Sequence, residues 1–370
     1  MNKTIGIFGG GQLGRMMAQA ALPLNIQCSF FEAETDCPAA ILGPVFSSKD
    51  PQALQAFIAS AEVFSLEFEN TPVADVDVLT QTKTLHPPRL ALATAQNRLA
   101  EKGLFDELAI PVAPYRAVDS LESLKQAVAE LGLPIVLKTV TGGYDGKGQF
   151  VLRSEDQIDT AWAELGPAKS LIAESFVKFS REVSIIAVRG QDGDVKTWAL
   201  AENHHHNGIL SHSIVPAPNS TDLQPVAQDY ITRLLNHLNY VGVLTLELFV
   251  TEQGLYANEM ACRVHNSGHW SIEGAICSQF ENHIRAVAGL PLGATDVVRP
   301  TVMVNIIGQH PKSEDVLALK GAHLHLYNKS ERAGRKLGHI TLMPNNSDEL
   351  TDLCRQLAQI LPVPLALTTD

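Results

Sequence analysis

The segment IVLKTVTGGYDGKGQFVLR, residues 135–153, places a glycine-rich loop between two apolar stretches typical of β-strands. The loop, residues 141–149, contains four glycines and Lys147. A Walker P-loop runs from a strand into a helix and ends in GK followed by Ser or Thr, whereas Lys147 is followed by Gly148. The pattern instead predicts an antiparallel hairpin whose loop lies over phosphate groups, with backbone N–H groups and Lys147 as donors.

Lys138 interrupts the first of these apolar strands. Burying an ammonium group without a counter-charge is costly, so the position predicts an anion beside Lys138. The alternative is a surface hairpin with an exposed lysine.

A second hairpin is predicted in VGVLTLELFVTEQGLYANEMACRVHNSGHW, residues 241–270. A three-residue turn over residues 252–254, with glycine last, centres the hairpin on Gln253. Glu247 then lies directly opposite Glu259, with Cβ atoms about 4.5–5.5 Å apart. Two facing carboxylates repel unless a cation bridges them, and all-oxygen ligands favour Mg²⁺, which usually keeps waters and substrate phosphates as its other ligands.

The alternative for this pair is two solvated glutamates on an exposed face, but the neighbouring residues 246, 248 and 249 are Leu, Leu and Phe, which favour a buried hairpin. The segment that follows adds Arg263, whose planar fork suits a carboxylate or phosphate. His265 and Asn266 add further groups that can orient a small anion.

The chain opens with TIGIFGGGQLGRMM, a strand, glycines 9, 11 and 14, and a helix. This satisfies the dinucleotide-binding pattern GxGxxG, and Glu32 lies near the place of an acidic residue that would hold a ribose. A nicotinamide oxidoreductase is therefore one function that these residues allow. The alternative is a tight turn whose helix N-terminus accepts any anion.

Strand and helix patterns alternate at first, with strands at 4–8, 27–32 and 63–66 and helices at 12–21 and 51–60, which predicts a mostly parallel α/β unit. From about 110 to 290, strands joined by short turns, with few helices, predict antiparallel α+β structure; TWALAE at 197–202 is expected to be one such strand. The predicted domains are residues 1–90, 91–292, with a glycine-loop subdomain at about 112–177, and 293–370.

The composition is that of a soluble globular protein, with 370 residues, 45% hydrophobic, 18% charged and a net charge of −12. The acidic balance argues against a nucleic-acid partner, and no apolar run reaches a membrane span of roughly 18–20 residues. Five cysteines without CxxC spacing argue against a disulfide framework. A cytoplasmic protein is expected.

Taken together, these features resemble the 5-(carboxyamino)imidazole ribonucleotide synthase family of ATP-grasp enzymes, over essentially the whole chain. The motifs that carry the resemblance are GGGQLGRM, EFEN, KTVTGGYDGKGQ, NEMACRVHNSGHW and KSERAGRKLGHI. Cys262 stands where a proline is common, and AES at 173–175 replaces a more usual VEQ. The resemblance implies an ATP-grasp fold with an N-terminal Rossmann-like domain that binds no nicotinamide and a small C-terminal domain.

The resemblance also implies site residues. ATP would contact Arg98, Lys138, Gly143, Tyr144, Asp145, Gly146, Lys147, Gly148, Gln149, Glu174, Ser175, Phe176, Val177, Glu182, His205, Asn258 and Glu259. Glu247 and Glu259 would bind Mg²⁺. Lys138, Arg263, His265 and Asn266 would be catalytic, the last three holding bicarbonate. Glu69, Tyr144, Asp145, Lys329, Arg332, Arg335 and Lys336 would bind aminoimidazole ribonucleotide.

The basic cluster at residues 329–336 can be interpreted without the family. Four cations in eight residues, with Gly334 among them, form a plausible phosphate nest, although a solvated loop is an equal alternative. The run NHHHNG at 203–208 suggests zinc, but alternate side chains of a strand point to opposite faces, and no carboxylate or cysteine completes a set at ligand spacing.

The reaction implied is ATP-dependent carboxylation of aminoimidazole ribonucleotide by bicarbonate through carboxyphosphate, in purine biosynthesis. A homodimer is expected from the resemblance alone. Three alternatives remain: a formate-using glycinamide ribonucleotide transformylase of similar architecture, the nicotinamide oxidoreductase, and a non-catalytic ATP-binding module. The last would be expected to lack the metal carboxylates, which are present.

Overall fold

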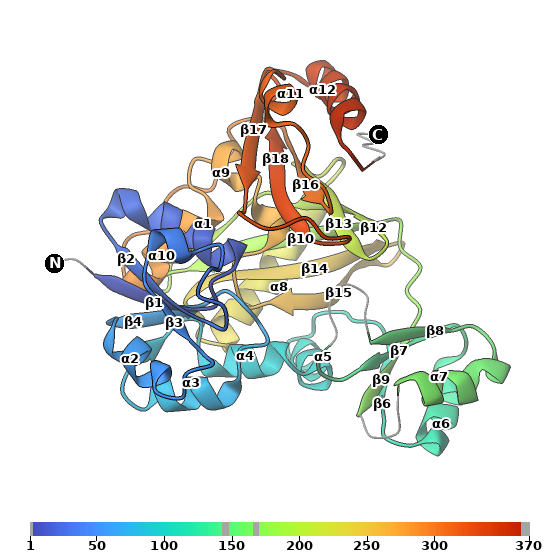
Figure 1. Ribbon diagram of the computed structural model, residues 1–370. Coiled ribbons are helices and arrows are strands. Elements are labelled where there is room, and N and C mark those ends of the chain that lie inside the picture. The colour runs from blue at the N-terminus through green and yellow to red at the C-terminus, as the bar shows by residue number, and fades with distance from the viewer. Residues whose placement is uncertain (1–2, 143–147, 166–169, 364–370) are drawn as a thin grey trace.

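The computed structural model describes residues 3–142, 148–165 and 170–363. Over these residues the strands form three sheets, of five, four and nine strands. Figure 1 shows the N-terminal domain in blue, the four-stranded unit in green at the opposite end, and the C-terminal strands, in orange to red at the top, which belong to the large sheet. The described residues include no helix long and apolar enough to cross a membrane.

The N-terminal sheet is parallel, with strand order β3-β2-β1-β4-β5. This confirms the predicted α/β unit, and the strands and first helix have the predicted bounds; the helix predicted at 51–60 is shorter. The elements are β1 (Thr4–Phe8), α1 (Gln12–Ala21), η1 (Leu22–Leu24), β2 (Gln27–Glu32), η2 (Ala40–Leu42), β3 (Val45–Ser47), α2 (Ala53–Ala59), β4 (Val63–Leu66), α3 (Val73–Thr80), β5 (Thr84–Leu85), α4 (Arg89–Ala95) and α5 (Arg98–Glu107).

The four-stranded sheet is antiparallel, in the order β6-β9-β7-β8. Strands β7 and β8 pair with Lys138 opposite Gln149, so the hairpin predicted around the glycine loop is confirmed. The loop residues Gly143, Tyr144, Asp145, Gly146 and Lys147 lie outside the described residues. The elements are β6 (Tyr115–Val118), α6 (Leu121–Leu131), β7 (Ile135–Thr139), β8 (Gln149–Leu152), η3 (Glu155–Gln157), α7 (Ile158–Leu165) and β9 (Leu171–Ser175).

The large sheet has the order β15-β14-β10-β12-β13-β16-β18-β17, with β11 beside β10. Because β13 pairs with β16, the predicted boundary between residues 292 and 293 falls between strands of one sheet. The elements are β10 (Arg181–Arg189), β11 (Val195–Thr197), β12 (Ala201–His206), β13 (Ile209–Val215), α8 (Leu223–His237), β14 (Gly242–Thr251), β15 (Gly254–Ala261), η4 (Asn266–Gly268), α9 (Ser271–Gly274), α10 (Gln279–Ala288), β16 (Thr301–Ile307), α11 (Ser313–Leu317), β17 (Ala322–Leu326), β18 (Lys336–Leu342) and α12 (Ser347–Ile360).

Two expectations about the middle of the chain were wrong. Helices are not few there, since α6, α7, α8 and α10 all fall between residues 110 and 290. Helix α6, for example, begins with a capping box at Ser120 and buries one face on its sheet. TWALAE is not one strand: β11 ends at Thr197 and β12 begins at Ala201, because the N–H of Leu200 donates to the Gln224 side chain, 2.8 Å away, instead of a neighbouring strand.

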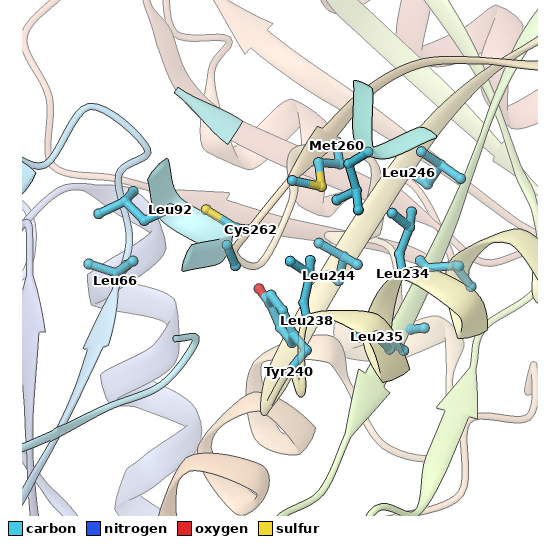
Figure 2. Packing of buried hydrophobic residues seen from close by; sticks show 14 of the residues in the cluster. Leu66, Leu92, Leu234, Leu235, Leu238, Tyr240, Leu244, Leu246, Met260 and Cys262 are labelled. Carbon is cyan, nitrogen blue, oxygen red and sulfur yellow. The ribbon is translucent and has the colours of Figure 1, made fainter. Parts of the chain in front are cut away.

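The N-terminal domain and the large sheet share one hydrophobic core. Cys262, at the end of β15, is fully buried in it, and Figure 2 shows its thiol near Leu66 and Leu92 of the first domain. Burial raises the pKa of this thiol. Cys262 therefore acts as a small hydrophobic residue that packs the two units together.

Candidate active site

The two glutamates predicted to face each other do so. Strands β14 and β15 pair with Glu247 opposite Glu259. The predicted turn was wrong by one residue, because Thr251 pairs with Gly254 and leaves a two-residue turn. A β-bulge then adds Asn258 to β15 and restores the predicted opposition.

The electrostatics of this pair fit a divalent cation. Burial, with the charges of Glu247 and Glu69, raises the pKa of Glu259 to about 7. Burial also acts to raise the pKa of Glu247, but His265, whose Nε2 lies 3.1 Å from Oε1 of Glu247, lowers it below its usual value. The described residues contain no group of three or more His, Cys, Asp or Glu that could hold a metal alone. Two carboxylates supplemented by water and substrate phosphates are a usual donor set for Mg²⁺.

The segment after β15 is held by contacts from three other parts of the chain. Arg263 Nη2 lies 3.1 Å from Glu69 Oε1 of the first domain. The amides of Asn266 and Asn305, the latter on β16, donate to each other over 3.0 and 2.7 Å. With the contact of His265 to Glu247, each of the three residues predicted to hold bicarbonate has a partner from a different region.

Lys138 has the anion that its position requires, and this anion is Glu174. Lys138 Nζ donates to Glu174 Oε2 over 3.1 Å, and Nζ of the buried Lys102 lies 3.6 Å from the same oxygen. Burial acts to raise the pKa of Glu174, but Lys102 and Lys138 hold it below its usual value. The ion pair does not exhaust the three donors of the Lys138 ammonium. Its contact with ATP stays a prediction.

Other predicted ATP residues line the same region. Arg98 begins α5 and donates from Nη1 to Thr139 O over 3.1 Å, next to the glycine loop. Gly148 accepts at its carbonyl from the N–H of Thr139, 2.9 Å away. Asn258 O accepts from Lys102 Nζ over 2.9 Å.

The hinge between the four-stranded and large sheets contains Ser175, Phe176 and Val177. The N–H of Ser175 donates to Pro114 O and that of Phe176 to Pro134 O, over 2.8 and 3.1 Å, so these two amides are occupied. Phe176 is 45% exposed, although phenylalanine is among the residues most often fully buried.

Glu182, predicted to contact ATP, lies beside His205, with Oε2 3.5 Å from Nδ1. Burial acts to lower the pKa of His205, but Glu182 raises it above its usual value. His204 stacks on His212 and its Nε2 lies 3.1 Å from Glu202, but among the described residues these side chains are not part of a group of three or more that could hold a metal ion.

The opening glycine turn is filled by carboxylates of the chain itself. Glu67 accepts from Gly14 N and, over 2.6 Å, from Gly11 N, and Glu32 accepts from Gly10 N over 3.0 Å. A Cβ at Gly11 would lie 2.4 Å from Oε1 of Glu67, so this glycine makes room for Glu67. A pyrophosphate would have to displace both carboxylates, which removes the basis of the nicotinamide alternative.

The predicted phosphate cluster lies between the first and C-terminal domains. Lys329 donates to Gln12 Oε1, and burial, with the charges of Arg335, Lys336 and Arg332, lowers the pKa of Lys329 to about 8. Such crowding of cations favours a bound anion. A cavity of about 580 Å³ adjoins them, lined by Arg15, Ile41, His310, Leu326, Asn328, Lys329 and Ser330.

Several buried polar residues were missed by the sequence interpretation. Gln279 brackets His265 through its backbone, accepting from its N–H over 2.9 Å and donating to its carbonyl over 2.6 Å. Glu101 accepts from Met260 N over 2.7 Å, and burial raises its pKa to about 8. The only sequence signal for such residues is a polar side chain in an otherwise apolar stretch, which does not name the partner.

Comparison with known proteins places this arrangement in a family. The ribonucleotide synthetase preATP-grasp domain matches residues 1–96, the ATP-grasp domain residues 103–280, and the phosphoribosylaminoimidazole carboxylase C-terminal domain residues 301–352. N5-carboxyaminoimidazole ribonucleotide synthase of Pseudomonas aeruginosa is 46% identical over 340 residues, which cover 91% of this chain and 94% of the relative. The chain belongs to the N5-carboxyaminoimidazole ribonucleotide synthase family. It therefore has the ATP-grasp fold that the motifs predicted.

Further members agree with this assignment. The synthase of Brucella melitensis is 48% identical over 346 residues, covering 91% of this chain and 95% of the relative. The crystal structure of the Thermus thermophilus synthetase superposes with a TM-score of 0.94 at 44% identity, covering 98% of this chain and all of that one. A structure of the Aspergillus clavatus synthase in complex with ADP and 5-aminoimidazole ribonucleotide has a TM-score of 0.90 at 30% identity, covering 97% of this chain and 98% of that one.

Proposed function

We propose that this chain carboxylates 5-aminoimidazole ribonucleotide with bicarbonate at the expense of ATP, giving N5-carboxyaminoimidazole ribonucleotide, ADP and phosphate in purine biosynthesis. The observation that carries the proposal is the meeting of Glu69, Glu247 and Asn305, from three regions of the chain, on the segment Arg263–Asn266. The names of the relatives support the same reaction.

In the first step, a bicarbonate oxygen attacks the γ-phosphorus of ATP, ADP leaves, and carboxyphosphate forms. Arg263, His265 and Asn266 hold the bicarbonate, and Lys138 and Arg98 bind phosphate oxygens, where fixed positive groups stabilise the developing charge. Glu247 and Glu259 would hold Mg²⁺, which when bound neutralises charge on the phosphates.

In the second step, the exocyclic amine of the ribonucleotide attacks the carboxyl carbon of carboxyphosphate, or of CO₂ released from it, and inorganic phosphate leaves. Lys329, Arg332, Arg335 and Lys336 bind the phosphate of the ribonucleotide, and Glu69 faces its base. Water destroys carboxyphosphate, so enclosure of the site is essential to the yield. The ATP site is completed by the remaining predicted ATP residues, namely Gln149, Glu174, Ser175, Phe176, Val177, Glu182, His205, Asn258 and the loop residues 143–148. Of the loop residues, Tyr144 and Asp145 would also contact the ribonucleotide.

The test is ADP release by the purified protein with Mg-ATP and aminoimidazole ribonucleotide, with bicarbonate present or stripped from the buffer. We expect ADP release that depends on the ribonucleotide and a carbamate product that requires bicarbonate. ADP release that instead requires formate and glycinamide ribonucleotide would assign the chain to formyl transfer. Protein that is folded and binds ATP, yet turns over with neither pair, would be a non-catalytic ATP-binding module.

The remaining expectations are part of the same proposal. The protein is a cytoplasmic homodimer whose partners are small molecules. Light scattering on the purified chain tests the dimer, and a mass corresponding to 40.0 kDa would contradict it.

A further inference from the structure

A chain of buried polar side chains runs across the large sheet and ends on His265. Ser213 Oγ on β13 donates to Asn203 Oδ1 on β12 over 2.8 Å, and Asn203 Nδ2 donates to Ser184 Oγ on β10 over 3.0 Å. Ser184 Oγ donates to Ser267 Oγ over 2.8 Å, and Ser267 Oγ lies 2.9 Å from His265 Nδ1. The two inner serines, Ser184 and Ser267, are fully buried, and Asn203 is 6% exposed.

The direction of this chain follows from the groups at its two ends. The Asn203 NH₂ faces Ser184, so Ser184 accepts from Asn203 and donates its own hydrogen to Ser267. At the other end, the backbone N–H of Ser267 points at His265 Nδ1 from 3.3 Å, so this nitrogen is an acceptor. The hydroxyl of Ser267 then donates to the same nitrogen.

The acceptor role of Nδ1 also determines the state of the other ring nitrogen of His265, Nε2. With Nδ1 accepting, a neutral His265 carries its hydrogen on Nε2, which lies 3.1 Å from Glu247 Oε1. The Nε2–H group of the ring therefore points at Glu247. Contacts at both ring nitrogens, Nδ1 and Nε2, restrain the orientation of the ring.

We propose that Asn203 is a positioning residue that, through Ser184, holds the Ser267 hydroxyl on Nδ1 of His265 and, together with the backbone N–H of Ser267, fixes the tautomer and orientation of the ring. The importance of His265 in catalysis rests on the proposed function; the tautomer does not. A polar chain in a sheet interior is costly unless every member is satisfied, and this one ends on a single side chain of the site. Where an imidazole takes part in catalysis, the partner that fixes its tautomer commonly contributes strongly to the rate.

The decisive substitution is Asn203→Asp, which keeps the size of the side chain but removes its donor. A carboxylate accepts from Ser184, so the Ser267 hydroxyl can turn toward Ser184 and away from His265. We expect kcat to fall at least about tenfold, as for other groups that orient a functional imidazole, while the KM for ATP changes less than about twofold.

A double-mutant cycle separates positioning from a general structural role. If Asn203 acts through Ser267, then adding Asn203→Asp to Ser267→Ala lowers kcat no further than Ser267→Ala alone, within about twofold. Losses that multiply would overturn the proposal. The control is Ser211→Ala on β13, the same change at a buried serine whose hydroxyl donates to His204 O over 2.7 Å, and we expect wild-type kcat within about twofold.

The tautomer itself is measured by ¹⁵N NMR of the unliganded protein in alkaline buffer, in which imidazoles are neutral, with the His265 signals assigned by their loss in His265→Gln. We expect hydrogen on Nε2 in the wild type and a changed Nδ1 shift in Asn203→Asp. Hydrogen on Nδ1 in the wild type, or unchanged shifts in the variant, would refute the proposal. This measurement uses no substrate, so it stands even if the carboxylation assay fails.

Discussion

The buried carboxyl group of Glu67 should make the folded protein less stable as the pH rises towards neutrality. Its oxygens accept hydrogen bonds from Gly11 and Gly14 at the start of α1. These bonds lower its pKa, but burial outweighs them and raises the pKa from its usual 4.5 to about 7. The folded state therefore retains a proton that the unfolded state releases at lower pH.

The magnitude follows from the linkage between proton binding and folding. Stability is unaffected below the unfolded pKa, falls as pH rises from 4.5 towards 7, and is level above it. Between about pH 5 and about pH 8 this carboxyl lowers the free energy of unfolding by about 2.5 kcal/mol. In Glu67→Gln this pH dependence is absent. The amide offers one acceptor oxygen to two N–H donors, which costs about 1–3 kcal/mol at every pH.

We expect Glu67→Gln to be less stable than the wild type at about pH 5, and the difference to shrink or reverse by about pH 8. Urea unfolding followed by tryptophan fluorescence over this range measures it. Glu34→Gln removes the same charge from a side chain that is 66% exposed, and should show a small, pH-independent difference. A Glu67→Gln difference that stays constant, or that widens with rising pH, would refute the reasoning.

Three further substitutions test the site. Glu259→Ala should abolish ATP turnover while circular dichroism shows an intact fold, and retained turnover would disprove the metal assignment. Lys102→Met should lower the free energy of unfolding by about 1–3 kcal/mol in urea titrations, because it leaves Glu174 buried with Lys138 as its remaining cation; an unchanged free energy of unfolding would contradict this pairing. Arg263→Lys keeps the charge but loses the planar fork beside Glu69, so the KM for bicarbonate should rise about tenfold in the ADP assay, the equivalent of one charge-assisted hydrogen bond; an unchanged KM would place bicarbonate elsewhere.

Local sequence patterns predicted where the charged site residues lie better than they predicted which residues those side chains contact. The alternation in β14 and β15 was enough to oppose Glu247 and Glu259, although the turn was misplaced by one residue. The bulge at Asn258 compensated, and no short-range signal predicts a bulge. The shorter turn and the bulge each shift the pairing by one residue, and the two shifts cancel at this position. Glu247 and Glu259 therefore still lie opposite each other on one face of the hairpin.

Partners that lie far away in the chain were beyond such reasoning. The need of Lys138 for an anion followed from its place in an apolar strand, but its ion partner Glu174 comes from β9, which pairs with β7 only in the folded sheet. Likewise the opening glycine turn was predicted to bind a dinucleotide or another anion at the helix N-terminus, and Glu67, which directly follows β4, occupies its N–H groups. A glycine turn in the sequence indicates room for an anion. Only the folded structure shows that this anion is a carboxylate of the chain itself, Glu67.

The placement of the segment Arg263–Asn266, proposed to hold bicarbonate, follows from the same principle. Its three predicted anion-binding side chains are each restrained by a residue outside their own segment, namely Glu69, Glu247 and Asn305. A small anion such as bicarbonate offers few contacts, so the free energy needed to order its binding groups must come from the protein. Restraints from distant parts of one chain provide this order before the substrate arrives. Because the ion to be bound is small, the site therefore depends on residues from distant parts of the fold to hold its binding groups in place.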